Sequence, residues 1–254
     1  MSQSLTVVVP VYNESEVLTE FHQRLTAVMV DSGLAYQVLY VNDGSDERCT
    51  ALLQELREGD GRVALLELSR NFGKEVALSA GLDHANGDAV VVIDADLQDP
   101  PEVIPRFIEA WQQGYDVVYG LRDERRGDSA LKRYTAGAFY KVMSALSDVE
   151  IPQNAGDFRL LSRRAVQALI AQPERHRYMK GLYAWIGFPQ KAIAYDREPR
   201  VAGESKWSYW QLWNFALEGI TSFSAAPLKM ATYLGLLTSS VSFIYGLFLL
   251  VRTL

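Results

Sequence analysis

The stretch Val91-Val92-Ile93-Asp94-Ala95-Asp96-Leu97-Gln98-Asp99-Pro100-Pro101 decides how the rest of this sequence is interpreted. It begins inside an apolar run, residues 89–93, that is typical of a buried parallel strand. The run ends at two carboxylates, Asp94 and Asp96, with one residue between them. The two prolines that follow cannot continue a strand, and proline suits the first turn of a helix. The stretch therefore predicts a buried strand, an acidic turn and a helix.

The two acids of this turn indicate a metal site. Side chains at positions i and i+2 of a strand end point to the same side, and two carboxylates there repel each other unless a cation lies between them. Magnesium prefers one or two carboxylates together with phosphate oxygens, so a divalent ion that also holds a diphosphate fits the pair. The alternative is an acidic turn that only caps the next helix, a role that Asp99 and Glu102 could fill alone.

The first 120 residues alternate apolar runs with helical patterns, which predicts an α/β fold with a mostly parallel sheet and helices on both faces. We expect strands at about 5–11, 35–42, 62–68, 88–94 and 115–120. We expect helices at about 14–30, 46–58, 73–86 and 101–113. Ligands of such sheets bind beyond the carboxyl ends of the strands.

The carboxyl ends of the first four expected strands all carry polar or aromatic groups. These are Pro10, Tyr12 and Glu14 after the first strand, Asp43 after the second, Lys74 after the third, and Asp94 and Asp96 after the fourth. Asp43 is placed to accept hydrogen bonds from ribose or a base, and Lys74 at a helix start suits an anion. The first strand lacks a G-x-G-x-x-G sequence after it, and the chain has no Walker P-loop, which argues against the usual dinucleotide and ATP sites.

The charge of the chain is divided unevenly. The net charge is −6, but residues 1–121 carry 7 Lys and Arg against 20 Asp and Glu, whereas residues 122–206 carry 16 against 10. An acidic half that suits a metal is thus followed by a basic segment that suits phosphates or an anionic membrane surface. The single cysteine, Cys49, excludes an intrachain disulfide and suits a reducing compartment.

After residue 121 the sequence predicts further elements. They are a charged loop at 122–129, a helix at about 130–147, a polar turn at 151–159 that leads into a short strand with Asp157 near its middle, helices at about 162–171 and 177–185, a strand at about 188–196, and a second loop at 197–206.

The C-terminal part predicts attachment to a membrane. Residues 208–223 form an aromatic-rich amphipathic pattern that suits the headgroup region of a bilayer. Between Lys229 and Arg252 lie 22 uncharged residues, about 33 Å as a helix, which is enough to cross the hydrocarbon core. The N-terminus leads straight into a strand, so we expect no signal peptide and a cytosolic domain. We divide the chain into a cytosolic domain (1–206), an amphipathic juxtamembrane helix (207–228) and a transmembrane helix (229–254).

Several of these motifs together resemble family 2 glycosyltransferases of the GT-A fold, and most closely their polyprenyl-phosphate glycosyltransferase group. The motifs are Val9-Pro10-Val11-Tyr12-Asn13-Glu14, Asn42-Asp43-Gly44-Ser45, Ser69-Arg70-Asn71-Phe72-Gly73-Lys74, residues 94–100, Gly156-Asp157-Phe158-Arg159-Leu160, Glu174-Arg175, Met179-Lys180-Gly181 and residues 217–223. Such proteins usually carry two transmembrane helices, whereas this sequence predicts one. The resemblance covers almost the whole chain, in order.

The resemblance implies roles for particular residues. It implies a nucleotide-sugar site that comprises Pro10, Tyr12, Glu14, Asp43, Lys74, Asp94 and Ala95, and a Mg²⁺ or Mn²⁺ site that comprises Asp94, Asp96 and Gln98. We predict Asp96, Asp157 and Arg122 as catalytic residues, and Arg122, Arg133 and Lys206 as the groups that hold the acceptor phosphate. The three cations are equally explained as surface residues, Asp157 as a structural turn acid, and Lys74 as an ordinary residue at a helix start.

The resemblance implies transfer of one hexose, with inversion, from a nucleotide sugar to polyprenyl (undecaprenyl) phosphate. UDP-glucose is the expected donor, and GDP-mannose is the alternative. The chain lacks the Gln-x-x-Arg-Trp motif of processive synthases, which favours a single transfer. We expect a homo-oligomer in the bacterial inner (plasma) membrane, with its catalytic domain in the cytoplasm and no nucleic acid partner. A membrane-tethered, non-catalytic nucleotide-sugar binding protein is the other alternative.

Overall fold

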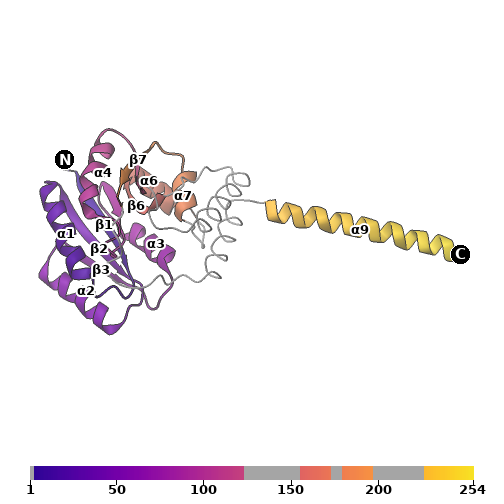
Figure 1. Cartoon of the computed structure of the whole chain (residues 1–254), viewed down its shortest axis with the longest axis horizontal. Coiled ribbons are helices and arrows are strands. Elements are labelled where there is room, and N and C mark those ends of the chain that lie inside the picture. The colour runs from indigo at the N-terminus through magenta and orange to yellow at the C-terminus, as the bar shows by residue number, and fades with distance from the viewer. Residues whose placement is uncertain (1–2, 123–154, 173–178, 197–225) are drawn as a thin grey trace. The chain divides into compact units, whose positions relative to one another are not determined.

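The computed structural model describes residues 3–122, 155–172, 179–196 and 226–254 (Figure 1). The described elements fall into two units, one that holds all the strands and one that holds the C-terminal helix α9. The predicted helix at 130–147, the amphipathic helix at 208–223, and the residues Arg133 and Lys206 lie outside the described residues.

The order of elements confirms the predicted alternation in the first 120 residues. The strands are β1 (Ser4–Val11), β2 (Ala35–Asn42), β3 (Val63–Glu67), β4 (Ala89–Val92), β5 (Val117–Arg122), β6 (Ala155–Ser162) and β7 (Gln190–Tyr195). The helices are α1 (Leu18–Asp31), α2 (Glu47–Gly59), α3 (Lys74–His84), the 3-10 turn η1 (Pro101–Val103), α4 (Ile104–Gln112), α6 (Arg163–Ile170), α7 (Met179–Trp185) and α9 (Ala226–Thr253).

The described strands form one seven-stranded sheet in the order β3-β2-β1-β4-β6-β5-β7. β6 runs antiparallel to both of its neighbours, β4 and β5, and every other neighbouring pair is parallel. This arrangement confirms the predicted mostly parallel sheet. It also brings the amino-terminal half of β6 to the same edge of the sheet as the carboxyl ends of the other strands.

Helices cover both faces of the sheet, as the alternation predicted. On one face, apolar side chains of α1, α2 and α4 join the strands in a common core, in which the rings of Phe107 and Phe158 lie 4.7 Å apart. On the other face, α3 lies so close to β1 and β2 that a Cβ at Gly81 would meet the Val8 side chain at 2.3 Å. Glycine is therefore required there for the close approach of helix and sheet.

Helix α9 matches the predicted transmembrane segment. It has 28 residues, about 42 Å at 1.5 Å per residue, and the bilayer core is about 30 Å thick. Its large apolar side chains from Leu228 to Leu250 are exposed. Within the described part of the chain, Leu228–Thr253 is the segment long and apolar enough to cross a membrane.

Candidate functional site

The predicted acidic turn lies where β4 ends, and its side chains alternate between the core and the open edge of the sheet. Ala95 and Leu97 are 2% and 0% exposed and pack into the core. Asp94, Asp96 and Gln98 alternate with them in the sequence and are only half-buried. The backbone N–H of Gln98 donates to Oδ1 of Asp96 at 3.1 Å, which fixes the turn. Three oxygen-bearing side chains are thus presented together.

The N-cap residues give no support to the alternative role of this turn as a helix cap. Neither Pro100 at η1 nor Val103 at α4 makes a side-chain capping hydrogen bond. Glu102 instead forms an ion pair with Arg24 at 2.8 Å. Asp99 is 1% exposed, and its Oδ1 accepts a hydrogen bond from the Tyr195 hydroxyl.

These side chains fit a metal that is shared with a diphosphate, and they do not form a complete metal cage. Among the described residues, no three His, Cys, Asp or Glu side chains are grouped to hold a metal ion by themselves. Magnesium sites on nucleotides need only one or two carboxylates, because phosphate oxygens and water complete the coordination. Asp94, Asp96 and the amide oxygen of Gln98 are a donor set of this kind.

Lys74 connects this turn to Asp157. Its ammonium lies 2.7 Å from Oδ2 of Asp94 and 2.6 Å from Oδ2 of Asp157. Burial disfavours the charge of Lys74, but the two carboxylates outweigh burial and raise its pKa above the ordinary lysine value. Burial likewise opposes ionisation of Asp157, and the nearby Lys74 and Lys180 outweigh it, so the pKa of Asp157 is lowered.

Asp157 reaches the site because β6 is antiparallel. Val92, the last residue of β4, pairs with Arg159, and Asp157 comes two residues before Arg159 in the antiparallel β6, so Asp157 lies beyond the end of β4. The sequence placed Asp157 in a polar turn near a short strand, and the structure places it within β6 at 8% exposure. Its structural surroundings are therefore those of a buried charged group and not of an exposed turn acid.

Arg122, at the end of β5, is held by Asp99 and Tyr195, and the sequence analysis did not predict either contact. Its guanidinium Nη2 lies 3.6 Å from Oδ2 of the buried Asp99, and its Nε donates to the Tyr195 hydroxyl at 3.4 Å. Gly156 leaves space for this guanidinium, because a Cβ at that position would lie 2.6 Å from Nη2. The pairing of β5 and β6 is irregular between Tyr119 and Leu121, and such irregularities redirect side chains near sites.

Asp43 fixes the loop before α3. Its Oδ1 accepts from the backbone N–H of Phe72 at 2.8 Å, and its Oδ2 accepts from that of Gly73 at 2.9 Å. Gly44, with φ of +66°, permits the close contact, because a Cβ there would lie 2.4 Å from the carbonyl carbon of Arg70. The contact of Asp43 with a nucleotide stays a prediction, and the structure adds a role for Asp43 in placing Lys74, the first residue of α3.

The remaining predicted nucleotide residues lie around the end of β1. Pro10 belongs to β1, Tyr12 follows it with 38% of its surface exposed, and Glu14 begins the turn into α1 through its carbonyl oxygen. Ala95 is buried, so any contact of Ala95 with a ligand involves its backbone. The structure thus brings Tyr12, Asp43, Lys74 and the acidic turn to neighbouring strands β1, β2, β3 and β4.

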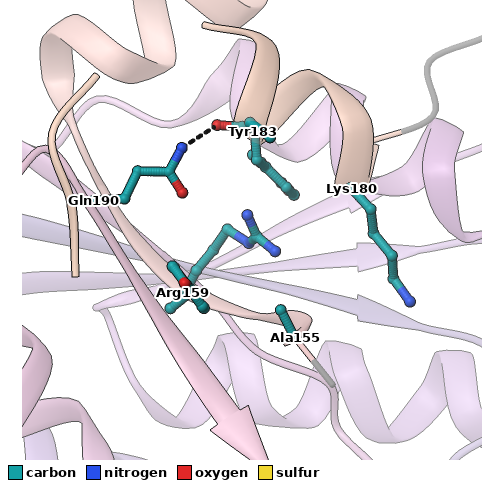
Figure 2. Close-up of a pocket in the computed structure, with 7 residues that line it drawn as sticks. Ala155, Arg159, Lys180, Tyr183 and Gln190 are labelled. Atoms are coloured by element: carbon teal, nitrogen blue, oxygen red, sulfur yellow. Dashed lines mark hydrogen bonds between the residues drawn. The ribbon is translucent and has the colours of Figure 1, made fainter. Parts of the chain in front are cut away.

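A second layer of charge lies near Asp157, and the sequence analysis did not predict its contacts. Figure 2 shows a small pocket in which Arg159 points toward the Tyr183 ring, 3.5 Å from its centroid, and Lys180 and Gln190 lie at the sides. Arg159 is 4% exposed and donates to the carbonyl of Gly156 at 2.6 Å. Lys180 and Arg159 are close enough to influence the charge of Asp157, and the residues that line the pocket do not include the predicted metal ligands.

Glu75 joins this layer from α3. Its Oε2 accepts from the backbone N–H of Met179 at 3.1 Å, which ties α3 to the start of α7. Burial and the nearby charge of Asp157 raise the pKa of Glu75 to about 7. The only sequence signal for this contact was the position of Glu75 next to Lys74.

Comparison with known proteins identifies the family. The model of glycosyl transferase family 2 matches residues 6–170. An uncharacterized glycosyltransferase of Synechocystis is 47% identical over 254 residues, which cover 100% of this chain and 80% of that protein. The bactoprenol glucosyl transferase of Shigella phage SfV is 46% identical over 250 residues, 98% of this chain and 81% of that protein.

Solved structures share the fold at lower identity. The mannosyltransferase PcManGT from Pyrobaculum calidifontis, in complex with GDP-Man and Mn²⁺, superposes with a TM-score of 0.57 at 17% identity, over 85% of this chain and 61% of that one. Glucosyl-3-phosphoglycerate synthase from Mycobacterium tuberculosis gives 0.55 at 18% identity, over 86% and 77%. By its fold, its family model and its near-full-length relatives, the chain belongs to glycosyl transferase family 2 and is a glycosyltransferase.

Proposed function

We propose that this enzyme transfers one glucose residue, with inversion, from UDP-glucose to a polyprenyl phosphate at the cytosolic face of the bacterial inner membrane. The name of the phage relative, bactoprenol glucosyl transferase, supports both the sugar and the lipid acceptor. The observation that carries the proposal is the edge of the sheet, where the Asp94–Asp96–Gln98 turn, Asp157 and Arg122 come together from β4, β6 and β5.

A divalent cation, Mg²⁺ or Mn²⁺, would be held by Asp94, Asp96 and Gln98 together with the donor diphosphate. When bound, it supplies positive charge for the diphosphate that departs from the anomeric carbon. Tyr12 offers an exposed ring for the base, while Asp43 and Glu14 lie near it at the ends of β1 and β2. Pro10 and Ala95 support these positions through the backbone.

The acceptor needs no strong general base in this proposal. A phosphate monoester has a second pKa of about 6, so a polyprenyl phosphate is largely a dianion at neutral pH. The reaction requires its alignment opposite the departing diphosphate. Arg122, which lies within the described residues, would bind the acceptor phosphate. We assign the same role to Arg133 and Lys206 from the sequence. Asp157, paired with Lys74, orients the sugar or the acceptor.

The lipid acceptor explains the membrane segment. Helix α9 would anchor the enzyme in the bilayer, where the polyprenyl chain of the acceptor also resides. The amphipathic segment at 207–228 would lie at the interface, and the enzyme would assemble as a homo-oligomer. A measurement of mass in detergent micelles tests that assembly.

The test of the function is a transfer assay with the purified full-length protein, radiolabelled UDP-glucose, undecaprenyl phosphate and Mn²⁺. We expect label in the extracted lipid for the wild type and none for Asp96→Asn. Label from GDP-mannose but not from UDP-glucose would assign the donor to the alternative. Nucleotide-sugar binding without labelled lipid from either donor would favour the non-catalytic alternative, and retained anomeric configuration would refute the single displacement.

A further inference from the structure

We propose that Lys74 is an internal counter-ion that occupies Asp94 before the metal binds and then moves to Asp157 alone, and so sets the metal affinity of the site. The proposal rests on the metal-dependent function given above and deepens it. It assigns Lys74 a role as a positioning residue, which differs from the predicted contact with the donor phosphate.

The first observation is the position of the ammonium group. Lys74 Nζ lies 2.7 Å from Oδ2 of Asp94, the same carboxylate that the metal would use. Two cations on one carboxylate repel each other, and the repulsion between a single and a double charge is twice that between two single charges. A metal at Asp94 therefore competes with Lys74 for the group.

The second observation is that Asp157 offers Lys74 a second position. Oδ2 of Asp157 already accepts Lys74 at 2.6 Å. Oδ1 of Asp157 is buried and has no hydrogen-bond partner within the described structure. A buried carboxylate oxygen without a partner is costly, so a donor that approaches it is favoured. Lys74 can leave Asp94, keep its ion pair with Asp157, and satisfy this oxygen.

The surroundings of Asp157 support such a movement. The Lys74 side chain is 38% exposed, so part of it remains free to change rotamer. It starts at the first residue of α3, after Gly73 with φ of +95°, and only its side chain has to move. Asp157 itself is fixed in β6, with Lys180 and Arg159 close enough to influence its charge. The carboxylate to which the ammonium group moves is thus rigid, whereas Lys74 itself has a long and partly exposed side chain.

The experiment measures Mn²⁺ binding to the full-length protein in detergent by the loss of the electron paramagnetic resonance signal of free Mn²⁺, without nucleotide. Lys74→Met should bind Mn²⁺ about tenfold more tightly than the wild type, because the competing charge is gone. Lys74→Arg keeps the positive charge, so its Mn²⁺ affinity should stay within about twofold of that of the wild type. Lys191→Met is the matched control, because Lys191 contacts Gln113 and the Tyr115 ring elsewhere on the domain.

A second variant separates the competition from a general effect on the fold. Asp157→Asn removes the second position of Lys74, so it should weaken Mn²⁺ binding about tenfold in the wild type. In the Lys74→Met background the same substitution should change it by no more than about twofold. Equal effects of Asp157→Asn in both backgrounds, or unchanged, weaker or undetectable Mn²⁺ binding by Lys74→Met, would overturn the proposal.

The outcome is distinguishable from a failure of the proposed function. If the wild type forms labelled glycolipid but Lys74→Met does not bind Mn²⁺ more tightly, the function stands and the counter-ion role is wrong. If no glycolipid forms while Lys74→Met binds Mn²⁺ more tightly, the counter-ion role stands for a site with another activity.

Discussion

The two hydrogen bonds of Asp43 provide a quantitative test of how the site is placed. Both carboxylate oxygens accept backbone N–H groups of the loop before α3, at 2.8 and 2.9 Å, and Asp43 is 3% exposed. In Asp43→Asn one oxygen becomes an NH₂ group that faces a backbone N–H donor. That donor is then half-buried and loses its acceptor, and the remaining hydrogen bond loses its charged partner.

The magnitude follows from these two losses. A hydrogen bond to a charged group contributes about 1.5–3 kcal/mol, and a buried donor without a partner costs about 1–3 kcal/mol. The two losses concern the same pair of hydrogen bonds and are not fully additive. We therefore expect Asp43→Asn to lower the free energy of unfolding of the α/β domain by about 2–4 kcal/mol. The displaced loop also carries Lys74, so Mn²⁺ binding should change with it.

The assay is a urea titration of the full-length protein in detergent, followed by far-UV circular dichroism. Asp46→Asn is the matched control, because Asp46 is the N-cap of α2 and accepts from the backbone N–H of Cys49 at 2.8 Å. Asparagine and aspartate cap helices about equally well, so this variant should stay within about 0.5 kcal/mol of the wild type. Equal stability of Asp43→Asn and Asp46→Asn would refute the structural role of Asp43.

Three further predictions address the chemistry of the site. Gly156→Ala places a Cβ 2.6 Å from Nη2 of Arg122 and so displaces this guanidinium. Because a cation displaced by about 1 Å is misaligned with the substrate, lipid glycosylation should fall by roughly tenfold to a hundredfold while the circular dichroism spectrum is unchanged. Normal turnover would contradict the placement of Arg122. The pKa of Glu75 is raised to about 7 from the ordinary glutamate value of 4.5, so the folded state binds more protons there than the unfolded state. The contribution of Glu75 to stability is therefore fully present below pH 4.5 and is lost as the pH rises through about 7. The stability of the wild type relative to Glu75→Gln should therefore fall between pH 5 and pH 8 in urea titrations, and a constant difference would argue against a buried carboxyl. Removal of divalent metal with EDTA should abolish transfer and excess Mn²⁺ should restore it, whereas full activity in EDTA would argue against the shared metal site.

The sheet and the acidic turn could be predicted because both depend on local patterns. The apolar runs predicted where β1 and β2 end, because polar residues follow each run directly. The alternation of side chains after Val92 likewise predicted that Asp96 points away from the core, while Ala95 is buried in it. The strand β6 was harder. Its position between β4 and β5 depends on pairings such as Val92 with Arg159, which join segments far apart in the sequence.

The partners of the charged residues could not be predicted for the same reason. Lys74 was expected to face a phosphate, and in the structure it binds Asp157, which is 83 positions later in the sequence. Asp99 was considered as a helix cap, and in the structure it accepts a hydrogen bond from the Tyr195 hydroxyl on β7. Local rules identify which residues are chemically suitable, while the strand order determines which of them meet.

The neighbouring residues Gly156 and Asp157 explain how one strand serves both halves of the proposed reaction. Successive residues of a strand point to opposite faces, so Asp157 and the space at Gly156 lie on different faces of β6. Asp157 binds Lys74 of α3, while Gly156 gives room to Arg122, which Asp99 and Tyr195 hold in place. One cation is thus paired with a predicted metal ligand, Asp94, and the other with Asp99. Both cations stand at the end of β6 that lies beside the Asp94–Asp96–Gln98 turn, so each of the two anionic substrates of the proposed reaction would meet a positive charge there. The antiparallel direction of β6, which the sequence pattern did not predict, places Gly156 and Asp157 at that end.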